Sequence, residues 1–379
     1  MTRWALTTLL ALILAACGQP TATSSPTASP RHTPTATPKP TPAPTPTPLP
    51  PPPNLAAAGG IYPVVGFSAY VYARGAGATT AMAFGPDGRL YVATQAGTVE
   101  VVSSPGAMPQ TLVSGLPIAL GLAWRGNELI VSVRGSVRSY QLSNGALTGG
   151  HVVVGGLPTG RHQNDAILPM PNGDVLLGVG STCDVCNEPD ARSAAVLRYR
   201  PDWSLAGIAV RGARNPYGLA LRASTGDAYV MINGQDNLGS QPADHMLRVV
   251  DGVDAGWPRC WPAYPDGSLH GNCGGVSPPV AVFTPHSSAD GIVIYGSGEF
   301  GADYADNAFV TEWGANAGGP IGRIVLRVVL SGSGASERGQ VSDFARGFSH
   351  PLAITVAPDG GLLVGDYGTG QITEIFRTS

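Results

Sequence analysis

The stretch Ala81-Met82-Ala83-Phe84-Gly85-Pro86-Asp87-Gly88-Arg89-Leu90-Tyr91-Val92-Ala93 contains two short apolar runs on either side of an Asp-Gly turn. Asp-Gly or Asn-Gly between apolar runs is a strong signal for a β-hairpin. After the turn near residue 88, similar turns follow near 126, 173, 226, 306 and 360, at intervals of 38, 47, 53, 80 and 54 residues. A four-stranded blade occupies roughly 40–50 residues, so six copies predict an all-β, six-bladed β-propeller over residues 54–379. Seven blades are the alternative, and the longest interval indicates an insertion at Pro258–Pro279.

The composition also favours short strands and tight turns. The 379 residues include 52 Gly and 35 Pro, and only 12% of the chain is charged. Glycine and proline at this abundance mark turns and interrupt helices. The formal net charge is −3, whereas a protein that binds nucleic acid presents a basic surface. We therefore expect no nucleic acid among the partners.

The first 53 residues have the pattern of a targeting segment and a linker. Arg3 precedes an apolar run at residues 4–16, and Leu14-Ala15-Ala16-Cys17 has the form of a bacterial lipobox. This predicts a signal peptide over 1–17, lipidation of Cys17 and an extracytoplasmic protein anchored to the membrane; a plain secretory signal is the alternative. Residues 18–53 hold 14 Pro and 9 Thr, which predicts a disordered, semi-extended polyproline tether.

Four further cysteines form two closely spaced pairs. Cys183 and Cys186 make a Cys-x-x-Cys motif, and Cys260 and Cys273 bracket the predicted insertion. Four thiolates could hold zinc, but the spacings differ and the compartment is oxidising. The expected arrangement is two disulfides, Cys183–Cys186 and Cys260–Cys273. A redox role for Cys-x-x-Cys is less favoured because no helical pattern follows the motif.

Polar clusters lie where ligand sites form in propellers, at the ends of inner strands near the axis. A histidine there could accept a proton, an arginine could hold an anion, and acidic side chains with free carbonyls in a Gly-rich loop could bind Ca²⁺. Each cluster alone has a structural explanation, but equivalent blade positions converge in space. The clusters are Arg161-His162-Gln163-Asn164-Asp165, Arg211-Gly212-Ala213-Arg214-Asn215-Pro216, the Asn233–His245 loop, and Thr284-Pro285-His286-Ser287.

These clusters also carry a resemblance that extends from about residue 60 to the end. The chain resembles the glucose/sorbosone dehydrogenase family of pyrroloquinoline quinone (PQQ) enzymes, whose motifs it matches in the same order. The matching motifs are His162 before a blade strand, Gly180-Ser181-Thr182-Cys183-Asp184-Val185-Cys186-Asn187-Glu188, Arg211–Ala220, Asn233-Gly234-Gln235-Asp236, Pro242-Ala243-Asp244, Ala255-Gly256-Trp257-Pro258, Pro285-His286-Ser287 and Gly322–Arg327.

The resemblance implies a role for each matched residue. His162 aligns with the family's general base, Arg214 with the arginine beside the reactive quinone oxygen, and Asn215 with its neighbour at the cofactor. The backbone carbonyls of the Ca²⁺-binding loop correspond to Gly234 and Gln235. The remaining matches are Asp236 and Asp244 in the acidic positions of that segment, His286 in the segment under the cofactor, and Arg323 where many members have a lysine that grips a PQQ carboxylate.

The function implied by the resemblance is oxidation of an aldose, or of a sugar aldehyde such as sorbosone, with PQQ and Ca²⁺ and an external electron acceptor. Three departures from the family pattern concern the substrate. Gln163-Asn164-Asp165 follows His162 where many aldose dehydrogenases have Gly-rich residues, and the aromatic residue near Phe283 is commonly Trp in other members. The Thr311–Asn316 segment also contains the acidic Glu312. Two alternatives are a non-catalytic surface propeller that binds carbohydrate or protein, and a Ca²⁺-dependent lactonase.

Overall fold

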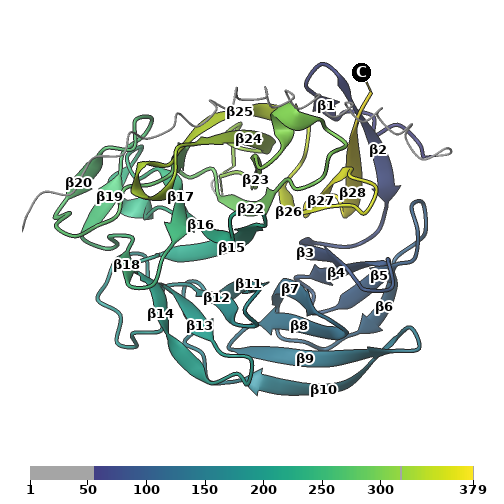
Figure 1. Ribbon diagram of the computed structural model, residues 1–379, viewed down its shortest axis with the longest axis horizontal. Helices are drawn as coiled ribbons and strands as arrows, with labels where there is room; N and C mark the ends of the chain where they lie inside the picture. The colour runs from purple at the N-terminus through teal and green to yellow at the C-terminus, as the bar shows by residue number, and fades with distance from the viewer. Residues whose placement is uncertain (1–54, 316–317, 379) are drawn as a thin grey trace, which may run out of the picture. The chain divides into compact units, whose positions relative to one another are not determined.

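The computed structural model describes residues 55–315 and 318–378, which form the all-β, six-bladed propeller that the repeats predict (Figure 1). The predicted signal peptide with Cys17 and the predicted linker at 18–53 lie outside the described residues. In the described part of the chain, no helix is long and apolar enough to cross a membrane. Helical structure in that part is limited to the 3₁₀ turns η1 (Asp236–Leu238), η2 (Ala302–Tyr304) and η3 (Gly334–Ser336).

Each blade is an antiparallel sheet whose first strand lies nearest the axis, and the six predicted turns join the first strand to the second. Blades 1 to 3 contain β3 (Thr79–Phe84), β4 (Leu90–Thr94), β5 (Val99–Val102) and β6 (Gln110–Val113); β7 (Ala119–Arg125), β8 (Glu128–Val133), β9 (Ser136–Ser143) and β10 (Ala146–Val154); and β11 (Asn164–Pro169), β12 (Val175–Val179), β13 (Ala195–Tyr199) and β14 (Leu205–Arg211). Blades 4 to 6 contain β15 (Asn215–Arg222), β16 (Asp227–Asn233), β17 (Asp244–Val249) and β21 (Ala281–Phe283); β22 (Ala289–Ile294), β23 (Ala308–Glu312), β24 (Ile324–Ser331) and β25 (Arg338–Arg346); and β26 (Pro351–Val356), β27 (Leu362–Asp366), β28 (Gln371–Arg377) and β2 (Phe67–Ala73).

Blade 6 combines both ends of the described chain. Strand β2 precedes blade 1 in sequence but pairs antiparallel with β28, so it forms the outer edge of the last blade. Strand β1 (Tyr62–Pro63) adds a fifth strand to blade 5 by pairing with β25. A closed ring leaves few exposed strand edges, which protects a protein of this kind from edge-to-edge association.

The insertion lies in blade 4, between its third and fourth strands. Strand β18 (Val253–Asp254) pairs in parallel with β14 of blade 3 and so extends that blade. A hairpin of β19 (Cys260–Pro262) and β20 (Leu269–Gly271) follows and forms a separate two-stranded sheet. The insertion therefore connects blades 3 and 4 at the outside of the ring.

Glycines allow the inner strands to approach one another closely around the axis. A Cβ added to Gly218 in β15 would lie 2.1 Å from the backbone oxygen of Asp290 in β22, and one added to Gly121 in β7 would lie 2.3 Å from that of Asp165 in β11. Real side chains do not approach backbone this closely. Because the inner strands are in close contact, the polar residues at their ends lie close together.

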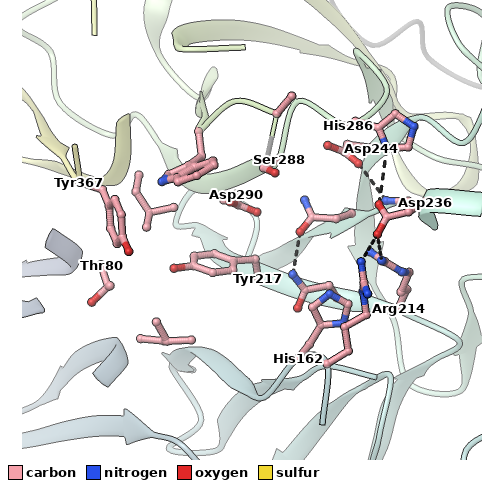
Figure 2. Close-up of a pocket in the computed structure, with 18 of the residues that line it drawn as sticks. Thr80, His162, Arg214, Tyr217, Asp236, Asp244, His286, Ser288, Asp290 and Tyr367 are labelled. Carbon is pink, nitrogen blue, oxygen red and sulfur yellow. Dashed lines mark hydrogen bonds and ion pairs between the residues drawn. The ribbon is translucent and has the colours of Figure 1, made fainter. Parts of the chain in front are cut away.

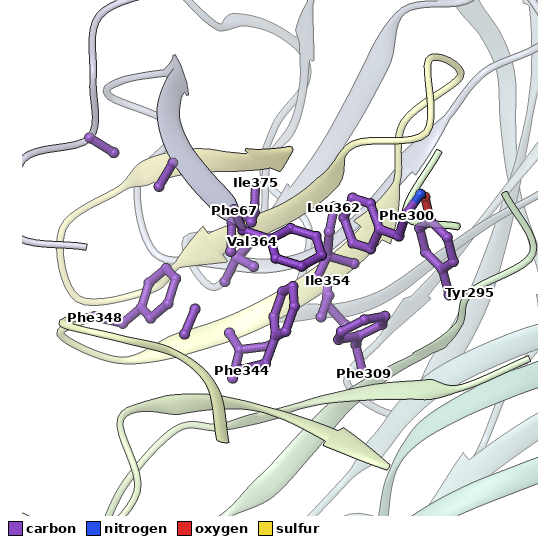
Figure 3. Packing of buried hydrophobic residues seen from close by; sticks show 14 of the residues in the cluster. Phe67, Tyr295, Phe300, Phe309, Phe344, Phe348, Ile354, Leu362, Val364 and Ile375 are labelled. Carbon is purple, nitrogen blue, oxygen red and sulfur yellow. The ribbon is translucent and has the colours of Figure 1, made fainter. Parts of the chain in front are cut away.

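The interface between blades 5 and 6 contains a cluster of aromatic side chains (Figure 3). The ring of Phe67 from β2 lies 4.8 Å from that of Phe300 and 5.0 Å from that of Phe344, both in edge-on geometry. Aromatic pairs at such spacing contribute about 0.5–1.5 kcal/mol beyond the apolar area that they bury. These contacts fix β2 against its neighbouring blade.

Candidate functional site

A cavity of about 850 Å³ lies at the end of the propeller where the inner strands begin, and all six blades contribute to its wall. The chemical character of its wall differs from one side to the other. Figure 2 shows Tyr217 in the middle, with Thr80 and Tyr367 on one side and His162, Arg214, Asp236 and His286 on the other. The charged side comes mainly from blades 3 to 5, where the sequence places its polar clusters.

His162 lies immediately before β11 and lines the cavity. Its backbone N–H donates to the carbonyl of Ser181 at 2.9 Å, and its Nδ1 lies 3.0 Å from the Ser181 hydroxyl. Burial, assisted by the positive charges of Arg214 and Arg161, lowers the pKa of His162 to about 3. The imidazole is therefore neutral at pH 7 and available to accept a proton.

Arg214 lies immediately before β15, with its side chain only 4% exposed. Its guanidinium donates to the carboxylate of Asp184 at 2.7 Å and to that of Asp236 at 3.0 Å. Asp236 also pairs with Arg161 and lies 3.6 Å from Nδ1 of His286. Two guanidinium groups and two carboxylates thus form one ion-pair network at the wall of the cavity.

The predicted Ca²⁺ loop connects β16 to β17 rather than preceding an inner strand. It reaches the same cavity because the second strand of a blade ends where the first begins. Gly234 and Asp236 line the cavity, and Asp244 accepts a hydrogen bond from the Gly234 amide at 2.8 Å. Burial raises the pKa of Asp244 to about 6, against the lowering effect of backbone hydrogen bonds from Gly234 and Ala289.

Two predicted site residues are not among those that line the cavity. The side chain of Gln235 is buried and donates to Asn237 at 3.0 Å, outside the set of residues that line the cavity. Arg323 has a backbone φ of 60° and packs against Gly314, and its Nε is buried without a hydrogen-bond partner among the described residues. His286 and Asn215, by contrast, both line the cavity.

Several residues that the sequence analysis did not single out complete the site. Burial raises the pKa of Tyr217 well above its usual value, and the carboxyl groups of Asp290 and Asp165 add to this effect. Tyr217 is therefore a neutral phenol in the middle of the cavity. Trp313 packs on His350 and Tyr367, with ring centroids 4.3 and 5.8 Å apart, and gives the wall opposite Arg214 an aromatic surface.

The four cysteines of the propeller form two disulfides, Cys183–Cys186 and Cys260–Cys273. These are the pairs that the spacing favours, and they leave no free thiolates for a four-cysteine zinc site. Among residues 55–315 and 318–378, one group of three His, Cys, Asp or Glu side chains is close enough to share a metal ion, namely Cys183, Cys186 and Glu188. Because both sulfurs of that group are oxidised, it lacks the thiolate ligands that a zinc site needs.

The site has the donors for an anionic, planar ligand. The guanidinium groups of Arg161 and Arg214 face it as donors, whereas the buried Oδ1 of Asn215 is an acceptor without a hydrogen-bond partner among the described residues. Gly234 and Asp236 offer oxygen atoms of the kind that Ca²⁺ prefers. The residues present are thus compatible with a quinone carboxylate cofactor and a calcium ion.

No protein-family model and no curated protein matches the sequence, but solved structures match the fold. A carbohydrate-active enzyme of family AA12 from Trichoderma reesei is 18% identical, with a TM-score of 0.73 over 86% of this chain and 99% of that one. The holo form of the PQQ domain of pyranose dehydrogenase from Coprinopsis cinerea is 16% identical, with a TM-score of 0.72 over 84% and 97%. The PQQ-bound aldose sugar dehydrogenase from Streptomyces coelicolor is 20% identical, with a TM-score of 0.64 over 83% and 99%. The chain therefore has the same fold as these three solved structures.

Proposed function

We propose that the protein is an extracytoplasmic PQQ-dependent sugar dehydrogenase that oxidises an aldose or a sugar aldehyde. The observation that carries this proposal is the position of His162, a neutral imidazole that lines a cavity beside the guanidinium groups of Arg161 and Arg214. The likeness in fold to PQQ-containing sugar dehydrogenases supports it.

The residues of the cavity have different roles in the proposed reaction. Arg214 and Asn215 would hold PQQ, which would supply the redox chemistry as the acceptor of a hydride from the substrate carbon. His162 takes the proton of the substrate hydroxyl, and this step together with loss of a hydride from the same carbon would convert an aldose into its lactone. Arg214 and Asn215 bind the cofactor, and Arg214 stabilises negative charge near it. Electrons then leave to an external acceptor, a quinone or a cytochrome.

The proposal includes Ca²⁺ held by the Gly234–Asp236 loop, with backbone carbonyls and the Asp236 carboxylate as ligands. His286 lies beside Asp236 and belongs to the same binding region. The Cys17 lipobox adds a lipid anchor that keeps the protein on the outer side of a bacterial membrane. In this proposal, the sugar binds against the aromatic wall around Trp313.

A reconstitution assay tests the proposal. The purified protein is loaded with PQQ and Ca²⁺, and reduction of an artificial dye is followed across a panel of aldoses and sugar aldehydes. We expect dye reduction that requires PQQ and is lost in His162→Ala. His151→Ala is the matched control, because His151 is exposed on the outer strand β10 and its imidazole bonds to the carbonyl of Gly149, away from the cavity. A folded protein that neither binds PQQ nor reduces dye would contradict the proposal and favour the binding propeller.

A further inference from the structure

The segment Gly180–Cys186 crosses the ends of blades 3 and 4 and contacts both His162 and Arg214. It leaves β12 after Val179, and the Ser181 amide donates to the Arg214 carbonyl at 2.7 Å while its carbonyl accepts from the His162 amide at 2.9 Å. Ser181 is completely buried. Its side chain therefore lies in a fixed position between His162 and Arg214.

The hydroxyl of Ser181 has a single hydrogen, and the structure shows where this hydrogen goes. Oγ lies 2.6 Å from the carbonyl oxygen of Cys183, an atom that can only accept. Oγ must therefore donate to Cys183, and it can only accept from Nδ1 of His162, 3.0 Å away. Nδ1 must carry the proton, and in a neutral ring Nε2 must then carry the free lone pair.

The carbonyl of Cys183 belongs to the four-residue loop that the Cys183–Cys186 disulfide closes. The same loop also holds Arg214, because the Asp184 carboxylate accepts two hydrogen bonds from its guanidinium. The backbone carbonyl of Asp184 accepts a further hydrogen bond from the indole of Trp257 at 3.0 Å. The disulfide loop is thus anchored to the base of the insertion and contacts the arginine directly and the histidine through Ser181.

We propose that Ser181 is a positioning residue that holds His162 as the Nδ1–H tautomer, with Nε2 as the proton acceptor, and that the Cys183–Cys186 loop keeps it in place. This deepens the proposed function, since it assigns the atom of His162 that accepts the substrate proton. The charged groups around His162 are Arg161 on its own segment, Arg214 from blade 4, Asp184 from the disulfide loop and Asp236 from the Ca²⁺ loop. None of them hydrogen-bonds to Nδ1 in the described structure, which leaves Ser181 as the group that selects the tautomer.

The test is a nitrogen NMR spectrum of the full protein labelled with ¹⁵N-histidine, recorded at pH 7 without PQQ, sugar or added metal. The sequence has 7 histidines, and His162→Gln identifies the signal. We expect a protonated Nδ1 and an unprotonated Nε2 for His162. Ser181→Ala removes the acceptor, so the ring should move toward the Nε2–H tautomer, which predominates in free histidine. Ser181→Thr keeps a hydroxyl and should restore the wild-type signal.

A wild-type spectrum with the proton on Nε2 would overturn the proposal, and so would a Ser181→Ala spectrum identical to the wild type. The role of the loop is tested in Cys183→Ser/Cys186→Ser, where we expect a mixture of tautomers. The matched control Cys260→Ser/Cys273→Ser removes the other disulfide, which lies in the insertion, and should leave the His162 signal unchanged. Equal effects in both double variants would contradict a specific role of the first loop.

Kinetics separate this inference from the proposed function. In the reconstituted enzyme, Ser181→Ala should lower kcat by about 10–100-fold, the usual effect of losing a group that orients a reacting one, with little change in KM for the sugar. Ser181→Thr should recover most of kcat. If the wild type shows no dehydrogenase activity, the proposed function fails, while the tautomer spectrum still decides the inference about Ser181.

Discussion

One oxygen of Asp184, Oδ1, accepts hydrogen bonds from both Nη2 and Nε of Arg214, at 2.7 and 3.1 Å. The same oxygen accepts from the backbone amide of Asp236 at 3.0 Å. Burial tends to raise the pKa of Asp184, but the Asp236 amide and the Arg214 guanidinium outweigh it, so the pKa lies below its usual value. A single carboxylate thus connects the arginine to the predicted metal loop.

Asp184→Ala should destabilise the protein because it leaves the buried Arg214 with one carboxylate instead of two. Removing one partner of a buried ion pair costs about 3–5 kcal/mol, and the remaining contact with Asp236 should keep the loss near the lower end of that range. The contribution is present above the usual carboxyl pKa and disappears as pH falls through the lowered one. Urea unfolding at pH 7 measures the loss. Asp251→Ala is the control, because its pair with Arg198 is exposed and worth at most about 1 kcal/mol.

His162 should stay neutral between pH 4 and pH 8 in the free protein, because burial and two arginines lower its pKa to about 3. The unfolded chain binds a proton at its histidines near pH 6.5, so this group destabilises the fold as pH falls from 6.5 toward 3. Arg161→Ala removes one positive neighbour and should raise the pKa of His162. An NMR titration measures both values, and a wild-type midpoint near 6.5 would refute the prediction.

Trp313→Ala should weaken sugar binding more than it slows turnover. Trp313 lines the cavity opposite Arg214 and is held by contacts with His350 and Tyr367. Loss of an aromatic stacking surface costs about 1–3 kcal/mol for a stacked nucleic-acid base, which would correspond to a rise in KM of roughly 5- to 150-fold. Trp313→Phe keeps part of the surface and should fall in between. An unchanged KM in both variants would place the sugar elsewhere.

Gly218→Ala should destabilise the ring because the new Cβ would lie 2.1 Å from the backbone oxygen of Asp290 in the neighbouring blade. Backbone in a closed ring cannot move away without displacing the adjacent inner strand, so we expect a loss of at least about 2 kcal/mol. Gly296→Ala is the control, because its Cβ would meet nothing within 4 Å. Thermal unfolding compares the two, and equal melting temperatures would contradict this view of the axis.

Glu374→Gln should stabilise the protein in mildly alkaline solution. Glu374 is completely buried in β28, and burial together with Asp359 raises its pKa to about 8. Because the folded protein holds this proton more tightly than the unfolded chain, stability falls as pH rises from about 4.5 to about 8. The glutamine variant lacks this loss, so its advantage in melting temperature should grow over that interval. A constant difference between the two proteins across the interval would contradict the assignment.

Much of the ring could be predicted because its repeats are local. Each inner hairpin is set by a turn and two apolar runs that adjoin in sequence, so all six turns could be located. The residues of blade 6 contributed by β2 could not, because the pairing of Phe67–Ala73 with Gln371–Arg377 joins segments about 300 residues apart and has no local signal. The insertion at Pro258–Pro279 was located by a long interval, but the parallel pairing of the preceding strand β18 with blade 3 has no counterpart in the pattern.

Part of the site could also be predicted from the local repeats, because they locate the starts of the inner strands. His162, Arg214 and His286 precede inner strands, and convergence at the axis brings them to one cavity. Tyr217 was overlooked because it stands in a run that otherwise has the composition of a buried strand. Asp184 was overlooked because its partner Arg214 lies 30 residues away. Arg323 is a residue with a left-handed backbone that is not among those lining the cavity, and its charge alone does not reveal this.

The pairing of β2 with β28 has a consequence for biosynthesis. Residues Gln371–Arg377 are translated about 300 residues after Phe67–Ala73, so β2 must wait for its partner strand over that interval. Until then the aromatic side chains and the free edge of β2 are open to other chains, as is common for proteins dominated by distant contacts. Blade 6 can therefore form only after Gln371–Arg377 has been made, and a variant that lacks β28 retains an unpaired edge on β2.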